Sequence, residues 1–216
     1  YTGIYYHADK TASAAMVSDA TVEVAQTDYG WLFDGPTEDT ALIFYPGAKV
    51  EAEAYAPMLH LLAGEGMDVC LVDMPFHLAF FGLNKAEAVM REHQYDSWFI
   101  GGHSLGGAMA ADFASSHGDQ LSGVVLFAAY PTKALEKNMT EISVYGSEDG
   151  VLNLEKTAAG KSFAPEAFYE CEIKGGNHAQ FGNYGDQKGD GTATISAQEQ
   201  QQQTVRFILD SVMPMR

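Results

Sequence analysis

The sequence has little positive charge. It contains 12 Lys and Arg residues against 29 Asp and Glu residues, so its formal net charge is −17 at pH 7. A charge of this sign and size repels the phosphate backbone of nucleic acids and the headgroups of anionic lipids. We therefore expect no nucleic-acid partner, and we expect the acidic surface to serve mainly solubility.

Long apolar runs and cysteines are also scarce. No stretch of 18 apolar residues occurs, so we expect no membrane-spanning segment and no stable membrane contact. The only cysteines, Cys70 and Cys171, lie in apolar strand-like runs and are interpreted as buried free thiols, with a disulfide as the alternative. The sequence starts at Tyr1 without an apolar signal core. We interpret this start as the trace of a removed segment and expect an extracytoplasmic location, with the cytoplasm as the alternative.

The composition is that of a globular chain. Of the 216 residues, 46% are hydrophobic and 19% are charged, which suits one domain with a substantial core. No internal repeat or linker interrupts the chain, so residues 1–216 are expected to form a single domain. The sequence does not indicate an oligomeric state.

Strand-like and helix-like segments alternate along the chain. The first two strands, at 20–28 and 29–35, are expected to be antiparallel. Further strands are predicted at 40–47, 68–75, 97–103, 122–131, 141–150 and 167–178, and helices at 54–66, 84–93, 104–118, 153–163 and 196–212. This alternation predicts an α/β fold with a mostly parallel sheet and helices on both faces. In such sheets, reactive groups lie at the carboxyl ends of the strands.

The segment "GGHSLGG" at 101–107 joins a predicted strand to a predicted helix. Ser104 lies at the centre of a G-x-S-x-G pattern, which is informative in this strand–turn–helix context. The turn is tight enough to strain Ser104, and Gly102 and Gly106 leave room for the neighbouring backbone. The helix N-terminus favours negative charge near the hydroxyl. Ser104 is therefore the candidate nucleophile.

A serine hydroxyl needs a base and a group that orients the base. Asp149 and His178 follow the apolar runs "EISVYG" (141–146) and "FYECEIKGG" (168–176), at the same sheet edge as Ser104 and in the order Ser, Asp, His. Glu148 is the alternative acid. Of the other histidines, His77 is expected near the mouth of the site, and His103 is expected to point away from it.

The chain resembles a small member of the α/β-hydrolase superfamily of the dienelactone-hydrolase-like branch, through "FYPGAKV", "GGHSLGG", "YGSEDG" and "GGNHAQFG". The resemblance implies an eight-stranded sheet without a cap domain, since only "TKALEKNMT" separates "FAAYP" from "EISVYG". It also implies Ser104 as nucleophile, His178 as base and Asp149 as acid, without a cofactor. The oxyanion hole would use the N–H groups of Leu105 and Ala48, with Lys49 as the alternative to Ala48. Dienelactone hydrolases proper use a cysteine nucleophile, where this chain has serine.

Two functions follow as expectations. The first is a serine hydrolase that cleaves a small or short-chain carboxylic ester or lactone through an acyl-enzyme, and the alternative is a non-catalytic binding module on the same scaffold. The segment 179–195 is expected to fold back beside the site and fix His178. Its stretch 186–193 resembles a calcium loop only faintly, because Lys188 and Ala197 occupy ligand positions, so no metal is expected.

Overall fold

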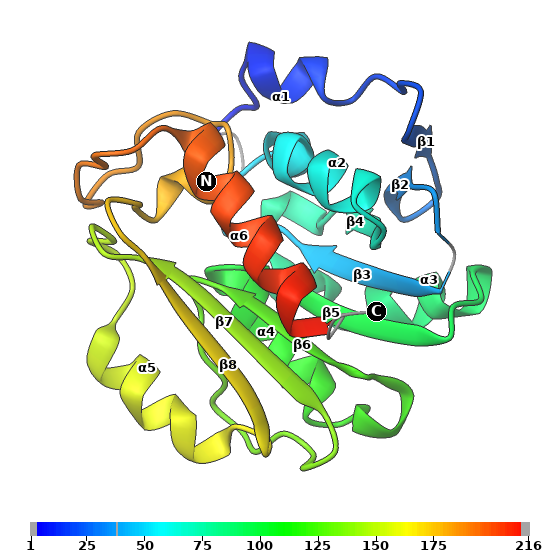
Figure 1. Cartoon of the computed structure of the whole chain (residues 1–216), viewed down its shortest axis with the longest axis vertical. Helices are drawn as coiled ribbons and strands as arrows, with labels where there is room; N and C mark the ends of the chain where they lie inside the picture. The colour runs from blue at the N-terminus through cyan, green and yellow to red at the C-terminus, as the bar shows by residue number, and fades with distance from the viewer. Residues whose placement is uncertain (1–3, 38, 213–216) are drawn as a thin grey trace.

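Eight strands form one sheet in the computed structural model, which describes residues 4–37 and 39–212 (Figure 1). Their order across the sheet is β1-β2-β4-β3-β5-β6-β7-β8. The strands are β1 Glu23–Gln26, β2 Gly30–Asp34, β3 Thr40–Tyr45, β4 Asp68–Val72, β5 Ser97–His103, β6 Gly123–Phe127, β7 Thr140–Gly146 and β8 Ala167–Ile173. The β1–β2 and β2–β4 pairs are antiparallel and all other pairs are parallel. The predicted mostly parallel sheet with an antiparallel first pair is confirmed.

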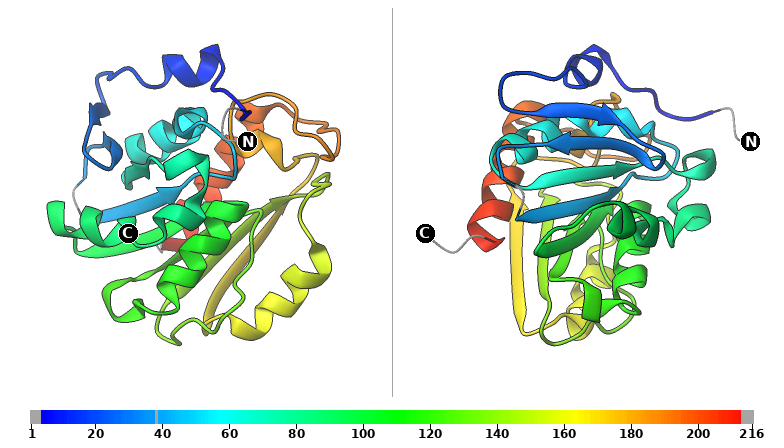
Figure 2. Two further views of the ribbon diagram at one scale, coloured as in Figure 1. Left: turned by 180° about the vertical axis from the view of Figure 1, so that it is seen from behind. Right: turned by 90° about the vertical axis from the view of Figure 1, so that its right-hand side faces the viewer.

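Helices cover both faces of this sheet. The α-helices are α1 Lys10–Ala14, α2 Ala56–Gly64, α3 Lys85–Glu92, α4 Leu105–Ala114, α5 Leu154–Gly160 and α6 Ala197–Val212, and the short 3₁₀ turns are η1 Ala52–Tyr55, η2 Pro75–His77, η3 Ala79–Gly82, η4 Gly118–Gln120, η5 Lys161–Phe163 and η6 Ala179–Phe181. Helices α2 and α6 pack together on one face, whereas α3 and α4 pack on the other (Figures 1 and 2). The predicted α/β-hydrolase fold is confirmed.

The sheet separates two apolar cores, because successive side chains of a strand point to opposite faces. In β3, Leu42 and Phe44 join the core under α2 and α6, while Ile43 and Tyr45 join the core under α3 and α4. All four are fully buried. A strand buried on both sides must be apolar throughout, which explains the continuous run "ALIFY".

The last helix begins where the sequence predicts. Ser196 and Glu199 form a capping box, in which the Ser196 N–H donates to Glu199 Oε2 at 2.8 Å and the Glu199 N–H donates to Ser196 Oγ at 3.2 Å. One turn further on, Gln200 is buried and Val205 and Ile208 enter the core. The glutamine-rich run 200–203 is therefore an ordinary part of a packed helix.

Three further observations bear on the sequence predictions. Cys70 and Cys171 are both free thiols, but only Cys70 is buried; Cys171 is partly exposed because β8 is an edge strand. Residues 128–139, between β6 and β7, contain no inserted cap. Within residues 4–37 and 39–212, no helix is both long and apolar enough to cross a bilayer.

Candidate active site

Ser104 occupies a strained turn between β5 and α4. Its backbone lies in the left-handed region, with φ 54° and ψ −120°, and its N–H donates to the Phe127 carbonyl at 2.9 Å. A non-glycine residue with such a φ costs roughly 1–3 kcal/mol and persists only where its surroundings fix it. A Cβ atom added at Gly102 or at Gly106 would collide with the Tyr45 carbonyl oxygen. The glycines on either side of Ser104 are therefore required by close backbone contact.

Asp149 and His178 meet at the carboxyl ends of β7 and β8. Asp149 Oδ2 lies 2.8 Å from His178 Nδ1, and both side chains are only 1% exposed. The other carboxylate oxygen, Oδ1, accepts the N–H groups of Val151 at 2.8 Å and Leu152 at 2.7 Å. Because an ionised carboxylate can only accept, the His178 proton resides on Nδ1 and the lone pair on Nε2. Glu148, the alternative acid, is exposed and accepts a hydrogen bond from Ser147 instead.

The second ring nitrogen of His178, Nε2, is buried and makes no hydrogen bond within the described residues. The His178 ring nevertheless lies against the turn, since its centroid is 4.4 Å from that of His103, the residue before Ser104. Hydrogen bonds of this type are often long in the absence of substrate. The structure thus brings together the turn, the imidazole and the carboxylate that the sequence singles out.

The prediction that His103 points away from the site is wrong. Its ring packs on His178, and its Nδ1 lies 2.8 Å from the Tyr55 hydroxyl, which also accepts the Gly47 N–H at 3.0 Å. Burial, assisted by the nearby His178, lowers the pKa of His103 well below its usual value. A neutral His103 therefore links the turn after β3 to the imidazole. The sequence does not reveal the contact between Tyr55 and His103, because the two residues are 48 positions apart.

Two backbone N–H groups, one in the turn at Ser104 and one in the turn after β3, lack partners within the described residues. Leu105 is the first residue of α4, so its N–H has no acceptor within the helix. Neither its N–H nor that of Ala48 donates a hydrogen bond within the described chain. The Lys49 N–H, by contrast, donates to the His77 carbonyl at 2.7 Å. Of the two alternatives after Gly47, Ala48 keeps its N–H available and Lys49 does not.

A residue that sequence analysis did not identify ties the two loops together. Asp190 Oδ1 accepts the N–H groups of His178 at 3.2 Å and Gly150 at 3.0 Å, while its Oδ2 accepts the Ala179 N–H at 2.8 Å. Asp190 belongs to the segment 179–195, which folds back over the His178 loop as predicted. Phe181 and Tyr184 of this segment are buried. No sequence signal distinguishes Asp190 from the exposed Asp186 in the same loop.

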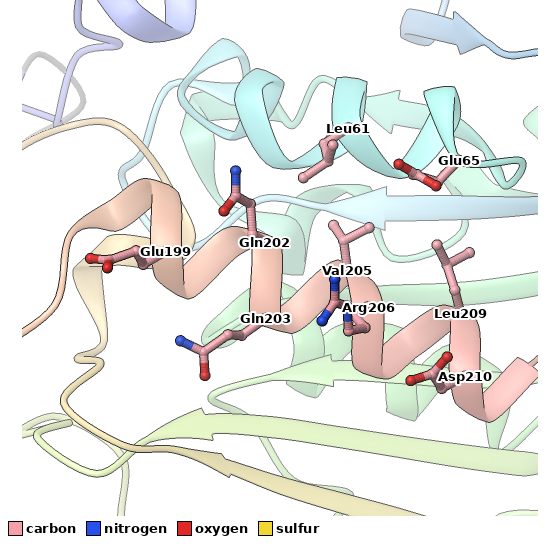
Figure 3. Close-up of a pocket in the computed structure, with 9 residues that line it drawn as sticks. All are labelled: Leu61, Glu65, Glu199, Gln202, Gln203, Val205, Arg206, Leu209 and Asp210. Carbon is pink, nitrogen blue, oxygen red and sulfur yellow. The ribbon is translucent and has the colours of Figure 1, made fainter.

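A hollow of about 710 Å³ lies away from this site, between α2 and α6 (Figure 3). It is lined by Leu61, Glu65, Glu199, Gln202, Gln203, Val205, Arg206, Leu209 and Asp210. None of these residues belongs to the site described above.

Within the described residues, no group of three or more His, Cys, Asp and Glu side chains is arranged to hold a metal ion.

The chain is similar to a family of known proteins. A family model described as the alpha/beta hydrolase family matches residues 41–203. No curated protein matches the sequence.

Several solved structures are similar in fold. A predicted CIB-like hydrolase from Thermoplasma acidophilum is 13% identical, with a TM-score of 0.66 over 90% of this chain and 100% of the other. Est1E from Butyrivibrio proteoclasticus is 14% identical, with a TM-score of 0.62 over 89% and 99% of the two chains. The carboxylesterase CesB from Bacillus subtilis is 8% identical, with a TM-score of 0.61 over 96% and 97%. At these identities the likeness shows the fold alone.

Proposed function

The chain belongs to the α/β-hydrolase family, and we propose that it is a serine hydrolase that cleaves a carboxylic ester or a lactone through an acyl-enzyme. The observation that carries the proposal is the buried Asp149–His178 hydrogen bond of 2.8 Å beside the strained Ser104. A binding module has no need for a buried imidazole with an unpartnered nitrogen next to a strained serine. Such strain and unpartnered groups concentrate at functional sites.

In the first half-reaction, Ser104 Oγ attacks the carbonyl carbon of the substrate. The hydroxyl proton passes to Nε2 of His178, and the carbonyl π electrons move onto the oxygen to give a tetrahedral oxyanion. Asp149 holds the imidazole through Nδ1 and stabilises its positive charge. When the intermediate collapses, the alkoxide leaves with the proton from Nε2, and the acyl group remains on Ser104.

The oxyanion is expected to bind the N–H groups of Leu105 and Ala48. The availability of both groups, and the hydrogen bond that occupies the Lys49 N–H, support this choice. The Leu105 group also lies at the N-terminus of α4, where the helix dipole favours negative charge. Loss of one such donor typically lowers kcat by about 10²- to 10³-fold.

In the second half-reaction, a water molecule attacks the acyl-enzyme. His178 Nε2 takes the proton from water, and Ser104 Oγ recovers it when the acid product leaves. Asp190 is a positioning residue in this scheme, because it accepts the N–H groups of His178 and Gly150 and so fixes the base and the acid loop relative to each other.

The absence of a cap within the described residues supports small or short-chain substrates, and the motifs support the dienelactone-like branch. The test is hydrolysis of a panel of acetyl, butyryl and lactone substrates by the wild-type protein and by Ser104→Ala. We expect turnover of short esters and a loss of roughly 10⁴- to 10⁶-fold in kcat for the variant, as is typical of such triads. A Ser104→Ala protein with a tenth of wild-type activity would refute the proposal.

A further inference from the structure

Three phenylalanine side chains in the segment that joins β4 to α3 are exposed to solvent. Phe76, Phe80 and Phe81, here called the aromatic patch, are 60%, 69% and 58% exposed. Their rings contact one another edge to face, with centroids 5.7 Å apart for Phe76 and Phe81 and 5.6 Å apart for Phe80 and Phe81. Single exposed apolar residues are ordinary, but a contiguous exposed group marks an interaction site.

The patch is built on a fixed backbone. Phe76 and His77 both adopt left-handed conformations, with φ 58° and φ 53°. Two such residues in succession are strained and need support from their surroundings. That support comes from backbone hydrogen bonds of His77, whose N–H donates to the Met74 carbonyl at 2.9 Å and whose carbonyl accepts the Lys49 N–H at 2.7 Å. The exposure of the rings is therefore a consequence of the local fold.

The segment that carries the patch contacts the turn after β3 and helix α4. The His77 carbonyl accepts the Lys49 N–H at 2.7 Å, and Lys49 directly follows Ala48. The η3 turn, which contains Phe80 and Phe81, packs against α4, which begins at Leu105. Figure 2 shows this segment on the same side of the sheet as α4. Strands β4 and β5 both run parallel to β3, and the patch and Ser104 each follow the carboxyl end of one of these strands, so the patch lies at the same edge of the sheet as Ser104.

The side chains of the patch and the net charge of the protein indicate which kind of ligand the patch would bind. Residues 74–83 contain no Asp, Glu, Lys or Arg, so this segment itself offers no side chain for an ion pair with a carboxylate or an ammonium group. The net charge of −17 disfavours anionic ligands and anionic lipid surfaces. Aromatic rings in edge-to-face contact offer faces and edges to a further ring, and such ring pairs gain stability beyond simple burial.

We propose that the aromatic patch is a subsite for an uncharged aromatic ring of the ester substrate, an inference that rests on the function proposed above. The ring belongs either to the acyl group or to the alcohol group. In either case the patch selects substrates through ring contacts, and Ser104 performs the chemistry.

The test compares matched esters on matched variants. The substrates are methyl 3-phenylpropanoate, its isomer 2-phenylethyl acetate, the cyclohexyl analogue of each, and ethyl acetate as the substrate without a ring. The variants are Phe80→Ala and Phe81→Ala, whose backbones are not left-handed. The control is Tyr169→Ala, which removes an exposed aromatic side chain on β8, outside the site.

We expect the two phenylalanine variants to lower kcat/KM for one of the phenyl esters by roughly 3- to 10-fold, mainly through KM. Activity on ethyl acetate and on the cyclohexyl analogues should change much less, and Tyr169→Ala should affect none of the substrates. The isomer that responds identifies the side of the ester that carries the ring. Equal losses on all substrates, or no loss on either phenyl ester, would overturn the proposal.

Labelling by a small fluorophosphonate distinguishes failure of the subsite from failure of the proposed function, because the label reports on Ser104 alone. If the wild-type protein is not labelled and cleaves no ester, the proposed function is refuted. If it is labelled but cleaves the phenyl esters no better than their cyclohexyl analogues, only the subsite is refuted.

Sedimentation and binding to neutral phosphatidylcholine vesicles distinguish the subsite from a dimer interface or a membrane contact. If Phe81→Ala dissolves a dimer or abolishes vesicle binding while phenyl selectivity is unchanged, the patch binds a second copy or a membrane and the subsite is refuted. A wild-type protein that is monomeric, does not bind the vesicles and loses phenyl selectivity in Phe81→Ala supports the subsite.

Discussion

The carboxylate of Asp190 accepts the backbone N–H of His178, with 3.2 Å between Asp190 Oδ1 and the nitrogen. The same oxygen accepts the Gly150 N–H at 3.0 Å, one residue after Asp149. One side chain therefore joins the loop of the proposed base to the loop of the proposed acid. Since the two loops follow different strands, their relative position depends on this side chain as well as on the sheet.

Replacement of Asp190 is expected to reduce catalysis more than stability. Asp190→Ala removes the acceptor of both loops and should lower kcat by roughly 10- to 100-fold with a small change in KM, because misplaced catalytic groups cost about that much. Asp190→Asn keeps one carbonyl oxygen and should recover part of the loss.

Asp186→Ala in the same exposed loop is the control and should behave as wild type. Steady-state kinetics and thermal unfolding are measured on each protein. If Asp190→Ala loses activity only in proportion to its folded fraction, Asp190 has no positioning role.

The two neighbouring acids offer a second test. Asp149→Asn preserves shape but replaces an oxygen that the His178 Nδ1–H contacts, so that the imidazole loses its orientation and tautomer. A loss of roughly 10³- to 10⁴-fold in kcat is expected. Glu148→Gln, whose exposed side chain accepts a hydrogen bond from Ser147, should stay within about twofold of wild type. A larger effect from Glu148→Gln than from Asp149→Asn would reverse the assignment.

Stability should depend on pH through Glu141. Burial, with a contribution from the negative charge of Glu170, raises the pKa of Glu141 from 4.5 to about 7. Between these values the folded protein keeps a proton that the unfolded chain releases, so the free energy of unfolding falls as pH rises from about 4.5 to about 7.

Glu141→Gln removes this proton equilibrium and should flatten that decline, so that the variant gains stability over wild type as pH rises. Denaturant titrations of both proteins at several pH values measure the difference. Parallel curves for the two proteins across this window would show that Glu141 ionises as readily in the folded protein as in the unfolded chain.

Chain length gives a further prediction. Without a cap over the described site, the distal part of a long acyl chain remains in water and gains little of the roughly 0.8 kcal/mol available for each buried CH₂ group. We expect kcat/KM for a homologous series of alkyl esters to level off after short acyl groups. A steady rise from acetyl to palmitoyl esters would mean that an apolar channel encloses the chain.

The sequence predicts the fold well because its signals are local. Three features show this: the apolar run of β3, the capping box at Ser196 and Glu199, and the glycines around Ser104. Each meets a requirement of the local backbone, so neighbouring residues are enough to predict it. The position of Asp149 and His178 also follows, since both end parallel strands at one edge of a known fold.

What the sequence does not reveal depends on long-range contacts. Tyr55 and His103 meet across 48 positions, and Asp190 differs from Asp186 only through the partners it finds after folding. The Lys49 N–H is occupied by the His77 carbonyl, on a different loop, and this favours Ala48 as the proposed oxyanion donor. Phe76 and His77, in the segment that carries the aromatic patch, adopt left-handed conformations that no sequence pattern predicts.

The most direct test of the central claim is active-site labelling with a fluorophosphonate, followed by mass spectrometry of the peptides. If Ser104 is the nucleophile and His178 its base, the wild-type protein should gain one phosphonyl group on Ser104. Ser104→Ala should gain none, and His178→Ala should react far more slowly. A wild-type protein that remains unlabelled, or that carries the label on another residue, would contradict the proposed mechanism.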